Sequence, residues 1–323
     1  MSQQNSVLYD VPGPRQRRIT LISSVVAAVL VLVGVYYLIY RPLDEKGQFT
    51  SELWGPLVDP GNENFSLVWD RIGIGLKNTL IAAVLAIISS LVVGTLIAVL
   101  RIQLKSLTRR RFTGLATPVS YLLRGLSVLL SAVTRFCVEV FRGLPVVITI
   151  FFVARGFPEF GITFDTLWYL VIGLTIYNSV VIAEILRSGM EGLPGGQAEA
   201  AAAIGLSPFQ TTRMILLPQA FRIMLPALIS QLVVVLKDTS LGFIISYEET
   251  LNIGKQIIGA LDNPIQVYAV IAVLFIAVNY SLSKLAQYVQ RRLSRGRRTA
   301  GTPAQNPPPA ALMSQAESSG QGV

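Results

Sequence analysis

Residues 196–218 read GQAEAAAAIGLSPFQTTRMILLP, a run of alanines followed by a glycine and then by Ser-Pro. The residues from Gln197 to Ile204 are strong helix formers. Glu199 falls in the first turn, where a carboxylate favours the positive end of the helix dipole. Gly205 is placed to end the helix, because glycine readily adopts the left-handed conformation that caps the last carbonyls. The stretch therefore begins with one short, glycine-capped helix.

A second short helix is predicted directly after the first. Ser207 and Pro208 match an N-cap followed by proline at the first helical position. We expect this helix to run to about Leu216 and to be stopped by Pro218. Two helices of about eight residues are marginal alone in water, so the pair needs a surface to pack on. That surface is either another protein or the chain's own helices.

The composition indicates an integral membrane protein. The 323 residues are 52% hydrophobic and 14% charged, against roughly 25% charged residues in an ordinary soluble domain. The net charge of +9 comes from blocks of Lys and Arg beside apolar runs, as membrane topology requires, and we expect no nucleic-acid binding. With no histidine and a single cysteine, Cys137, the chain offers no disulfide, and we expect neither a metal site nor catalytic residues.

Six apolar segments have the length of membrane-spanning helices. They lie at residues 19–40, 76–100, 133–153, 167–186, 223–246 and 265–288. The first is too long for a signal peptide and is followed by no A-x-A-like cleavage site, so we interpret it as an uncleaved helix. We therefore expect a multi-pass protein of the plasma membrane.

The charge pattern predicts which side of the membrane each loop faces. Residues 41–71 hold six acidic and three basic residues, whereas residues 101–135 hold seven basic residues and no acidic one. Because cytoplasmic loops carry the excess of Lys and Arg, both termini and the loop 187–222 are predicted to be cytoplasmic. The tail 291–323 is rich in Pro, Ser, Gly and Gln, and we expect it to be disordered.

One spacing makes the hairpin resemble a known family. The hairpin contains Glu199-Ala200-Ala201, then Gly205 after three residues, Ile215 after nine more and Leu217-Pro218 after one more. This spacing resembles the EAA motif of ABC importer permeases, E-A-A-x3-G-x9-I-x-L-P. Further stretches resemble the amino-acid subfamily: EVFRGLPVV at 139–147, AEILRSG at 183–189, LPQAFRIMLPALI after the hairpin and LKDTSL at 236–241. The N-terminal part of the chain resembles the glutamate permeases of high-GC Gram-positive bacteria. The resemblance lies in the stretch SVLYDVPGPRQRR, the extra first helix and the acidic outer loop.

The resemblance implies a fold and a domain organisation. The fold is all-α, with six transmembrane helices in the type I ABC importer (MetI-like) arrangement and an extra N-terminal helix, since most of the family has five spans. The implied parts are a cytoplasmic tail at 1–18, the extra helix and outer loop at 19–71, the permease domain at 72–290 with its EAA loop at 187–222, and the tail at 291–323.

The resemblance also implies partners and a coupling role for the hairpin. In this family the short helix docks in a groove on a separate ATPase subunit. The implied coupling residues are Glu199, Ala200, Ala201, Gly205, Leu217 and Pro218. The chain has no G-x-x-x-x-G-K-[ST] motif, so we expect that it cannot hydrolyse ATP by that machinery and binds no cofactor, and that the partner uses ATP and Mg. The other implied partners are a second, homologous or identical permease, an extracytoplasmic solute-binding protein and membrane lipid.

Polar residues inside the predicted spans are candidates for the substrate path. A charge at mid-bilayer is costly and usually faces a cavity or a partner. The candidates are Lys237, Asp238, Gln231, Ser230, Glu184 and Arg142. A basic and an acidic group would complement the carboxylate and ammonium of an amino acid. The alternative is that Lys237 and Asp238 form structural ion pairs with other spans, such as those holding Glu139, Arg142 or Glu184.

Three functions are compatible with these observations. The leading one is the permease subunit of an ATP-driven amino-acid importer, with glutamate as the favoured substrate. An ion-driven secondary transporter would not need the EAA hairpin and would favour discontinuous helices. A membrane scaffold would leave the intramembrane charges of Lys237 and Asp238 unexplained.

Overall fold

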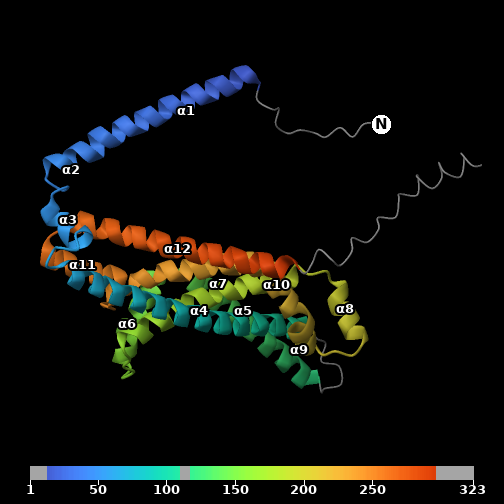
Figure 1. Ribbon diagram of the computed structural model, residues 1–323. Coiled ribbons are helices and arrows are strands. Elements are labelled where there is room, and N and C mark those ends of the chain that lie inside the picture. The colour runs from blue at the N-terminus through green and yellow to red at the C-terminus, as the bar shows by residue number, and fades with distance from the viewer. Residues whose placement is uncertain (1–12, 110–116, 296–323) are drawn as a thin grey trace, which may run out of the picture. The chain divides into compact units, whose positions relative to one another are not determined.

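The computed structural model describes residues 13–109 and 117–295, and every regular element within these ranges is a helix (Figure 1). Six of the described helices are long and apolar enough to cross a membrane. The predicted all-α class and the number of spans are confirmed. Parts of the predicted tails, 1–18 and 291–323, lie outside the described residues.

The elements follow one another in this order: α1 Pro14–Val35, the π-helical η1 Tyr36–Tyr40, α2 Arg41–Glu45, α3 Ser51–Val58, α4 Phe65–Arg109, α5 Thr117–Gly143, α6 Val146–Glu159, α7 Thr166–Glu191, α8 Gly196–Ala203, α9 Pro208–Thr211, the π-helical η2 Thr212–Leu216, α10 Leu217–Asp238, the 3-10 helix η3 Thr239–Ile245, α11 Thr250–Leu261 and α12 Pro264–Arg295. They form two compact units, which are described separately. Of the described residues, unit 1 comprises 13–76 and 250–273, and unit 2 comprises 77–109, 117–249 and 274–295.

In unit 1, side-chain amides tie the loop after α1 to the start of α12. Gln266 is fully buried, and its Nε2 donates to the backbone oxygen of Gln48 at 2.6 Å. Asn263, also fully buried, donates to the backbone oxygen of Leu53 at 3.1 Å. The indole of Trp54 donates to that same oxygen of Gln48 at 3.0 Å. Because backbone carbonyls of an irregular segment need partners when buried, these bonds give the loop a defined path.

Unit 2 is organised around α7. Half of its 26 residues are buried, among them Leu170, Leu174, Asn178, Ile182, Leu186 and Met190. A step of four residues goes about 40° beyond a full turn, so this row of buried positions winds around the helix and faces more than one neighbour. The helix packs mainly against α6 and α10 and also meets α5 and η3. One core cluster surrounds Leu170 and Leu174, and a second surrounds Ile182 and Leu186. Thus α7 is the central helix of this unit.

Two glycines allow neighbouring helices to approach α7 closely. A Cβ on Gly94 of α4 would lie 2.7 Å from the backbone oxygen of Ser179 and 2.8 Å from Cγ2 of Ile182. A Cβ on Gly173 of α7 would lie 2.8 Å from Cα of Ile150 on α6. Small residues at such crossings are the usual means of packing helices in membranes, because lipid gives no hydrophobic drive for association.

The turn after η3 closes this part of unit 2. The Tyr247 hydroxyl donates to the backbone oxygen of Asn78 at 3.1 Å. Burial raises the pKa of Tyr247 to about 12, and the negative charges of Asp165 and Glu249 act in the same direction. The phenol therefore remains protonated, and able to donate this hydrogen bond, throughout the physiological pH range.

The boundaries of the predicted third span are wrong. The segment 133–153 is divided between α5, which begins at Thr117, and α6, with a break at Leu144-Pro145. Pro145 cannot continue a helix and serves instead as the N-cap of α6, with extended backbone at φ −60° and ψ 134°. Residues 118–132 are interrupted by Arg124 and were assigned to a basic inner segment, but the structure places them in the first half of α5.

Substituting Gly94 by leucine is expected to lower the stability of the isolated permease by about 1–3 kcal/mol, because overpacking at the crossing with α7 forces the helices apart. The measurement is the thermal unfolding midpoint in detergent. Gly73→Leu on the same helix is the matched control, since nothing lies within 4 Å of a Cβ built there. Equal midpoints for the two variants would contradict the assigned crossing.

Candidate functional site

The first helix of the hairpin, α8, ends in a complete glycine cap. Gly205 has φ +81°, in the left-handed region. The Leu206 amide donates to the oxygen of Ala201 at 3.0 Å, and the Gly205 amide donates to the oxygen of Ala202 at 3.0 Å. These are the two bonds of the Schellman motif, which satisfies the last carbonyls of a helix. The predicted role of Gly205 as a turn residue is confirmed.

The second helix, α9, begins with the predicted cap. The Gln210 amide donates to the Ser207 hydroxyl at 3.3 Å, and the Ser207 amide donates to Oε1 of Gln210 at 2.8 Å. Together these bonds make a capping box, and Pro208 occupies the first turn. Only two non-helical residues follow Gly205 before α9 begins, so the relative direction of α8 and α9 is set by capped ends on both sides.

The predicted end of the second helix is wrong. Helix α9 continues through η2 into α10, and residues 208–245 form one helical span that includes Pro218. In η2 the Leu217 amide donates to the oxygen of Thr212, five residues earlier. This π turn already interrupts the regular i to i−4 pattern, so the absent amide of Pro218 is accommodated at the start of α10.

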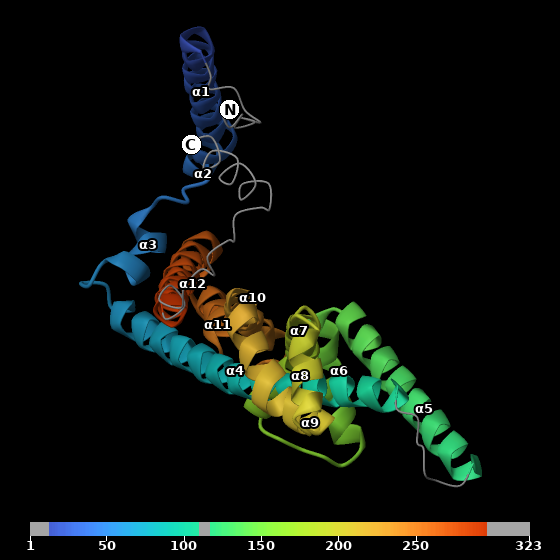
Figure 2. The same cartoon turned by 90° about the vertical axis from the view of Figure 1, so that its right-hand side faces the viewer.

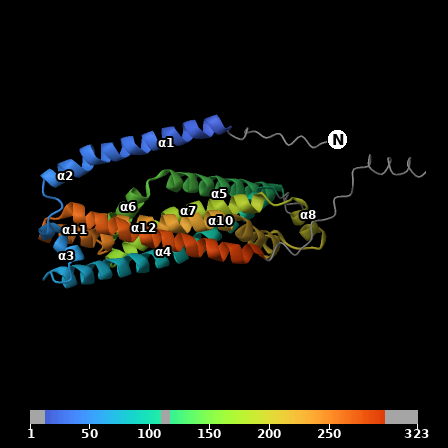
Figure 3. The same ribbon diagram turned by 45° about the horizontal axis from the view of Figure 1, so that its top comes forward.

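The hairpin, residues 196–218, lies at one end of the helices of unit 2. Figures 1 and 3 show α8 beyond the ends of α7 and α10, and Figure 2, viewed from that side, shows α8 in front of them. Its two helices are tied to different transmembrane helices. Gln219 of α10 donates to Oε1 of Gln197 on α8 at 2.7 Å. Gln103 of α4 donates to Oγ1 of Thr212 in η2 at 2.8 Å. The hairpin is thus an ordered structure with one outward surface.

The hairpin's candidate residues divide by exposure. Glu199, Ala200, Gly205 and Pro218 are exposed, Leu217 is half-buried, and Ala201 is only 2% exposed. The side chain of Ala201 therefore packs within this chain and is not available to a partner. The resemblance placed Ala200 and Ala201 in the same contact, and the structure separates them.

Three large apolar side chains on the outward surface of the hairpin were missed from the sequence. Ile204 is 76% exposed, Met214 is 64% exposed and Phe209 is 52% exposed. Each lies outside the apolar core of a predicted span, and Ile204 and Phe209 flank the turn at Gly205. An apolar residue on either side of a predicted turn, away from the membrane, was the signal that could have found them. Apolar patches with a polar rim mark interaction sites.

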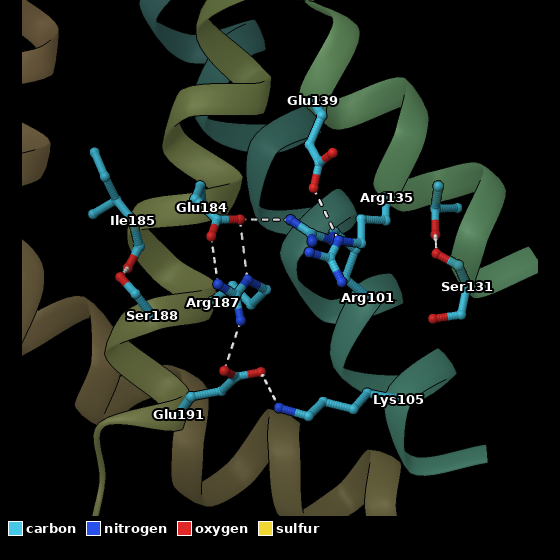
Figure 4. Close-up of polar contacts among 11 residues, drawn as sticks. Arg101, Lys105, Ser131, Arg135, Glu139, Glu184, Ile185, Arg187, Ser188 and Glu191 are labelled. Carbon is cyan, nitrogen blue, oxygen red and sulfur yellow. Dashed lines mark hydrogen bonds and ion pairs between the residues drawn. The ribbon is translucent and has the colours of Figure 1, made fainter. Parts of the chain in front are cut away.

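A cluster of charged side chains joins α4 to the last turns of α7, close to where the hairpin begins (Figure 4). Nη1 of Arg101 lies 2.5 Å from Oε2 of Glu184. Arg187 binds both carboxylate oxygens of Glu184, and its Nη1 lies 2.6 Å from Oε2 of Glu191. Lys105 reaches the other oxygen of Glu191 at 2.8 Å. Three cations thus hold two carboxylates.

The cluster changes the interpretation of two predicted path residues. Glu184, a substrate-path candidate, has both oxygens occupied by arginines and a side chain that is only 24% exposed. Arg142, another candidate, is exposed on α5, and Glu139 pairs within the same helix with Arg135 at 2.9 Å (Figure 4). The structure does not bring Glu184 and Arg142 together.

The four candidates on α10 also separate. Gln231 donates to Oδ1 of the buried Asn178 on α7 at 2.7 Å, so it faces the interior of the unit. Ser230 and Lys237 lie two turns apart on an exposed face, with Val234 between them. Asp238 is half-buried. Within the described ranges neither Lys237 nor Asp238 has an ion pair, so the alternative of structural pairing with Glu184 or Arg142 gains no support.

A cavity of about 620 Å³ lies between α4, α5 and α7. Hydroxyls line it, and each already donates to a backbone oxygen of its own helix: Ser89, Thr134, Thr175 and Ser179. Arg101 at its edge is held by Glu184. Because every lining donor named here is satisfied, the cavity suits an apolar group better than an amino acid.

Comparison with known proteins identifies the family. Residues 115–295 match the family model described as binding-protein-dependent transport system inner membrane component. The chain is 38% identical over 262 residues to the glutamate transport system permease protein GluD of Corynebacterium glutamicum, covering 79% of this chain and 85% of that protein. The chain is an amino-acid ABC transporter permease. This result confirms the resemblance found in the EAA spacing.

Other permeases agree with this assignment. The chain is 34% identical to the probable glutamine ABC transporter permease protein GlnP of Bacillus subtilis, covering 71% of this chain and 95% of that protein. Solved structures share the MetI-like fold. An amino acid ABC transporter solved with histidines matches with TM-score 0.57 and 24% identity over 71% of this chain and 96% of that one. The inward-facing methionine transporter MetNI matches with TM-score 0.56 and 21% identity over 72% of this chain and 99% of that one.

Membership defines the permease's general role. It is the transmembrane component of a binding-protein-dependent amino-acid importer, a multi-pass membrane protein and a transport subunit rather than an enzyme. Several relatives are named as ABC transporter permeases, and the ion-driven alternative has no support among them.

Replacing Gly205 by valine is expected to weaken the cap of α8. A β-branched residue in the left-handed region costs at least about 1–2 kcal/mol, although nothing lies within 4 Å of a Cβ at this position. The strain would therefore come from the backbone alone. Hydrogen–deuterium exchange should be faster at the amides of residues 205 and 206 in the isolated permease. Gly205→Asn is the control, since asparagine tolerates this conformation, and unchanged protection in the valine variant would refute the assigned strain.

Proposed function

We propose that the chain is the permease subunit of an ATP-driven importer for polar amino acids, with glutamate as its preferred substrate. The observation that carries the proposal is the outward surface of the hairpin. Its exposed apolar side chains are Ile204 and Phe209, on either side of the glycine turn in the sequence, and Met214 in η2, and Glu199 is also exposed. A surface of this composition, held rigidly at the end of a membrane bundle, suits docking to another protein.

The docking partner in this proposal is a separate ATPase subunit. Glu199 and Ala200 would contact its groove, with Gly205 setting the angle of the hairpin and Leu217 and Pro218 fixing its return into α10. Ala201 would act indirectly, by seating α8 against its own chain. ATP and Mg would be bound by the ATPase dimer, and no cofactor by this chain. Support comes from the EAA spacing and from the family assignment.

The proposed orientation places the hairpin and both termini in the cytoplasm. The loop between α4 and α5 and the end of α12 carry basic residues, whereas residues 41–71 are acidic. The rule that cytoplasmic loops hold Lys and Arg supports this orientation. A solute-binding protein would then deliver substrate on the extracytoplasmic side, to which the charge rule assigns the acidic residues 41–71, and anionic lipid would contact the basic side.

A second permease, homologous or identical, is proposed to cover the exposed face of α10. Pro226, Ser230, Val234 and Lys237 recur at helical spacing on this face. An ammonium group facing lipid inside the bilayer would be costly, so a protein or an aqueous path is expected opposite Lys237. Two such faces would enclose a path, with Ser230 and Lys237 as substrate-contacting residues and Asp238 at its rim. Gln231 and Glu184 would support this wall from behind.

The preference for glutamate rests on similarity along the chain. The permease of Corynebacterium glutamicum, named for glutamate transport, shares 38% identity, while a permease named for glutamine in Bacillus subtilis shares 34%. Lys237 would attract an acidic side chain in an aqueous path. Glutamine is the competing substrate, because it offers the same backbone groups without the second carboxylate.

Phe209→Ser is expected to weaken binding of the ATPase by about tenfold to a hundredfold. Removing one buried phenylalanine from an interface loses roughly 1.5–3 kcal/mol, which corresponds to that range of Kd. The affinity is measured between purified permease and ATPase in detergent or nanodiscs. Phe160→Ser is the matched control, because Phe160 is 83% exposed in the loop between α6 and α7 and outside the hairpin. Equal affinities for the two variants would exclude the hairpin surface as the docking site.

Reconstitution tests the transport function itself. Vesicles holding the permease, its ATPase, a second permease and the glutamate-binding protein should take up labelled glutamate only when ATP is supplied, and unlabelled glutamine should compete weakly. The control is the same assembly with an ATPase whose phosphate-loop lysine is replaced. Uptake without ATP would reject the proposed energy source, and faster uptake of glutamine than of glutamate would reject the proposed substrate.

A further inference from the structure

The end of α4 is attached to the chain on both sides of the hairpin. On the entry side, Arg101 and Lys105 hold Glu184 and Glu191 of α7 at 2.5 and 2.8 Å. Residues 101 and 105 are one turn apart, so both side chains leave the same face of α4. Glu191 is the last residue of α7, and only four residues separate it from α8. This attachment therefore fixes the point where the chain leaves the bundle.

On the exit side, α4 holds the chain through Gln103. Its amide nitrogen donates to the Thr212 hydroxyl at 2.8 Å and approaches the backbone oxygen of Pro208 at 3.4 Å. Thr212 is 2% exposed and Gln103 is half-buried, so this contact is largely shielded from water. A buried polar contact of this kind fixes geometry, because separating the two groups would leave them unpaired. This attachment fixes the point where the chain returns from the hairpin.

Both attachments come from a short length of one helix. Residues 101 to 105 span about 6 Å along the axis of α4, at 1.5 Å per residue. The segment between the two attached points, from Glu191 to Pro208, contains α8 and its cap. A displacement of the hairpin that moves Glu191 or Thr212 also pulls on this segment of α4, in addition to the direct bond between Gln197 of α8 and Gln219 of α10.

The charge balance makes the entry-side attachment sensitive to single changes. Glu184 and Glu191 are each shared by two cations, with Arg187 as the common member. The side chains of Arg101 and Glu184 are only 15% and 24% exposed, so solvent screens this pair less than a surface pair. Removing Arg101 leaves Glu184 with a partner on its own helix only, and α4 is then released from this point of α7.

We propose that Arg101, Gln103 and Lys105 are positioning residues that make the end of α4 move together with the hairpin when the ATPase opens and closes. The inference rests on the proposed docking of an ATPase at the hairpin. In this arrangement α4 transmits the movement of the hairpin along the bundle, although α4 itself does not contact the ATPase. The residues bind neither substrate nor nucleotide.

Cross-linking measures the common movement directly. In a Cys137→Ser background, Gln103→Cys and Thr212→Cys are joined by a short bifunctional thiol reagent in the assembled transporter. The expected yield is the same without nucleotide and with ATP and vanadate, and the cross-linked transporter should keep at least half of its uptake rate. The two single-cysteine chains are the controls for the reagent. A several-fold change in yield between the states, or loss of uptake on cross-linking, would overturn the proposal.

Substitution of Arg101 gives an independent measurement. Arg101→Gln should lower the amino acid taken up per ATP hydrolysed several-fold, whereas Arg101→Lys, which keeps the charge toward Glu184, should restore most of that ratio. Arg41→Gln is the matched control, because Arg41 pairs with Glu45 within one exposed helix. The unmodified chain in the same vesicles reports on the proposed function: if it shows no ATP-driven uptake, that function fails, whereas normal uptake by the unmodified chain with an unchanged ratio in Arg101→Gln refutes the positioning role alone.

Discussion

Close approach of helices to α7 is the constraint on which unit 2 depends. Lipid tails are as apolar as leucine, so helices in a bilayer gain little from hydrophobic burial and depend on contact and hydrogen bonds. Gly94 and Gly173 remove the Cβ atoms that would keep α4 and α6 away from α7. Where α4 touches α7, Ser89 and Thr175 come within hydrogen-bonding distance, and Gln231 of α10 makes a second polar contact to α7 at Asn178. The packing of unit 2 therefore depends on small residues that let the helices touch and on polar pairs that then form between them.

The features that the sequence predicted well are local ones. Gly205 and Ser207 act through amides within six residues, so their spacing alone identifies a glycine cap and an N-cap. The number of membrane helices was also accessible, since it depends only on the length of each apolar run. The EAA spacing was then sufficient for the family, because it combines a local cap with a fixed return into the membrane.

The features that were missed depend on contacts distant in sequence or on competing local rules. The pairing of Arg101 with Glu184 joins residues 83 positions apart, and nothing in either neighbourhood indicates the other. Pro145 and Pro218 look alike in the sequence, yet one breaks the helix and the other lies within it, because a π turn precedes only Pro218. The sequence does place Ile204 and Phe209 on either side of a predicted turn, but how far each is exposed depends on how α8 packs against its own chain.

The first helix, α1, differs from the helices of unit 2 in how exposed its residues are. None of its residues is buried, and its apolar side chains are distributed around the whole helix. Within unit 1 its sequence therefore has to satisfy the bilayer and not a packing partner. Such a segment can exchange one apolar residue for another freely. We expect its composition to follow the requirements of the surrounding lipid alone.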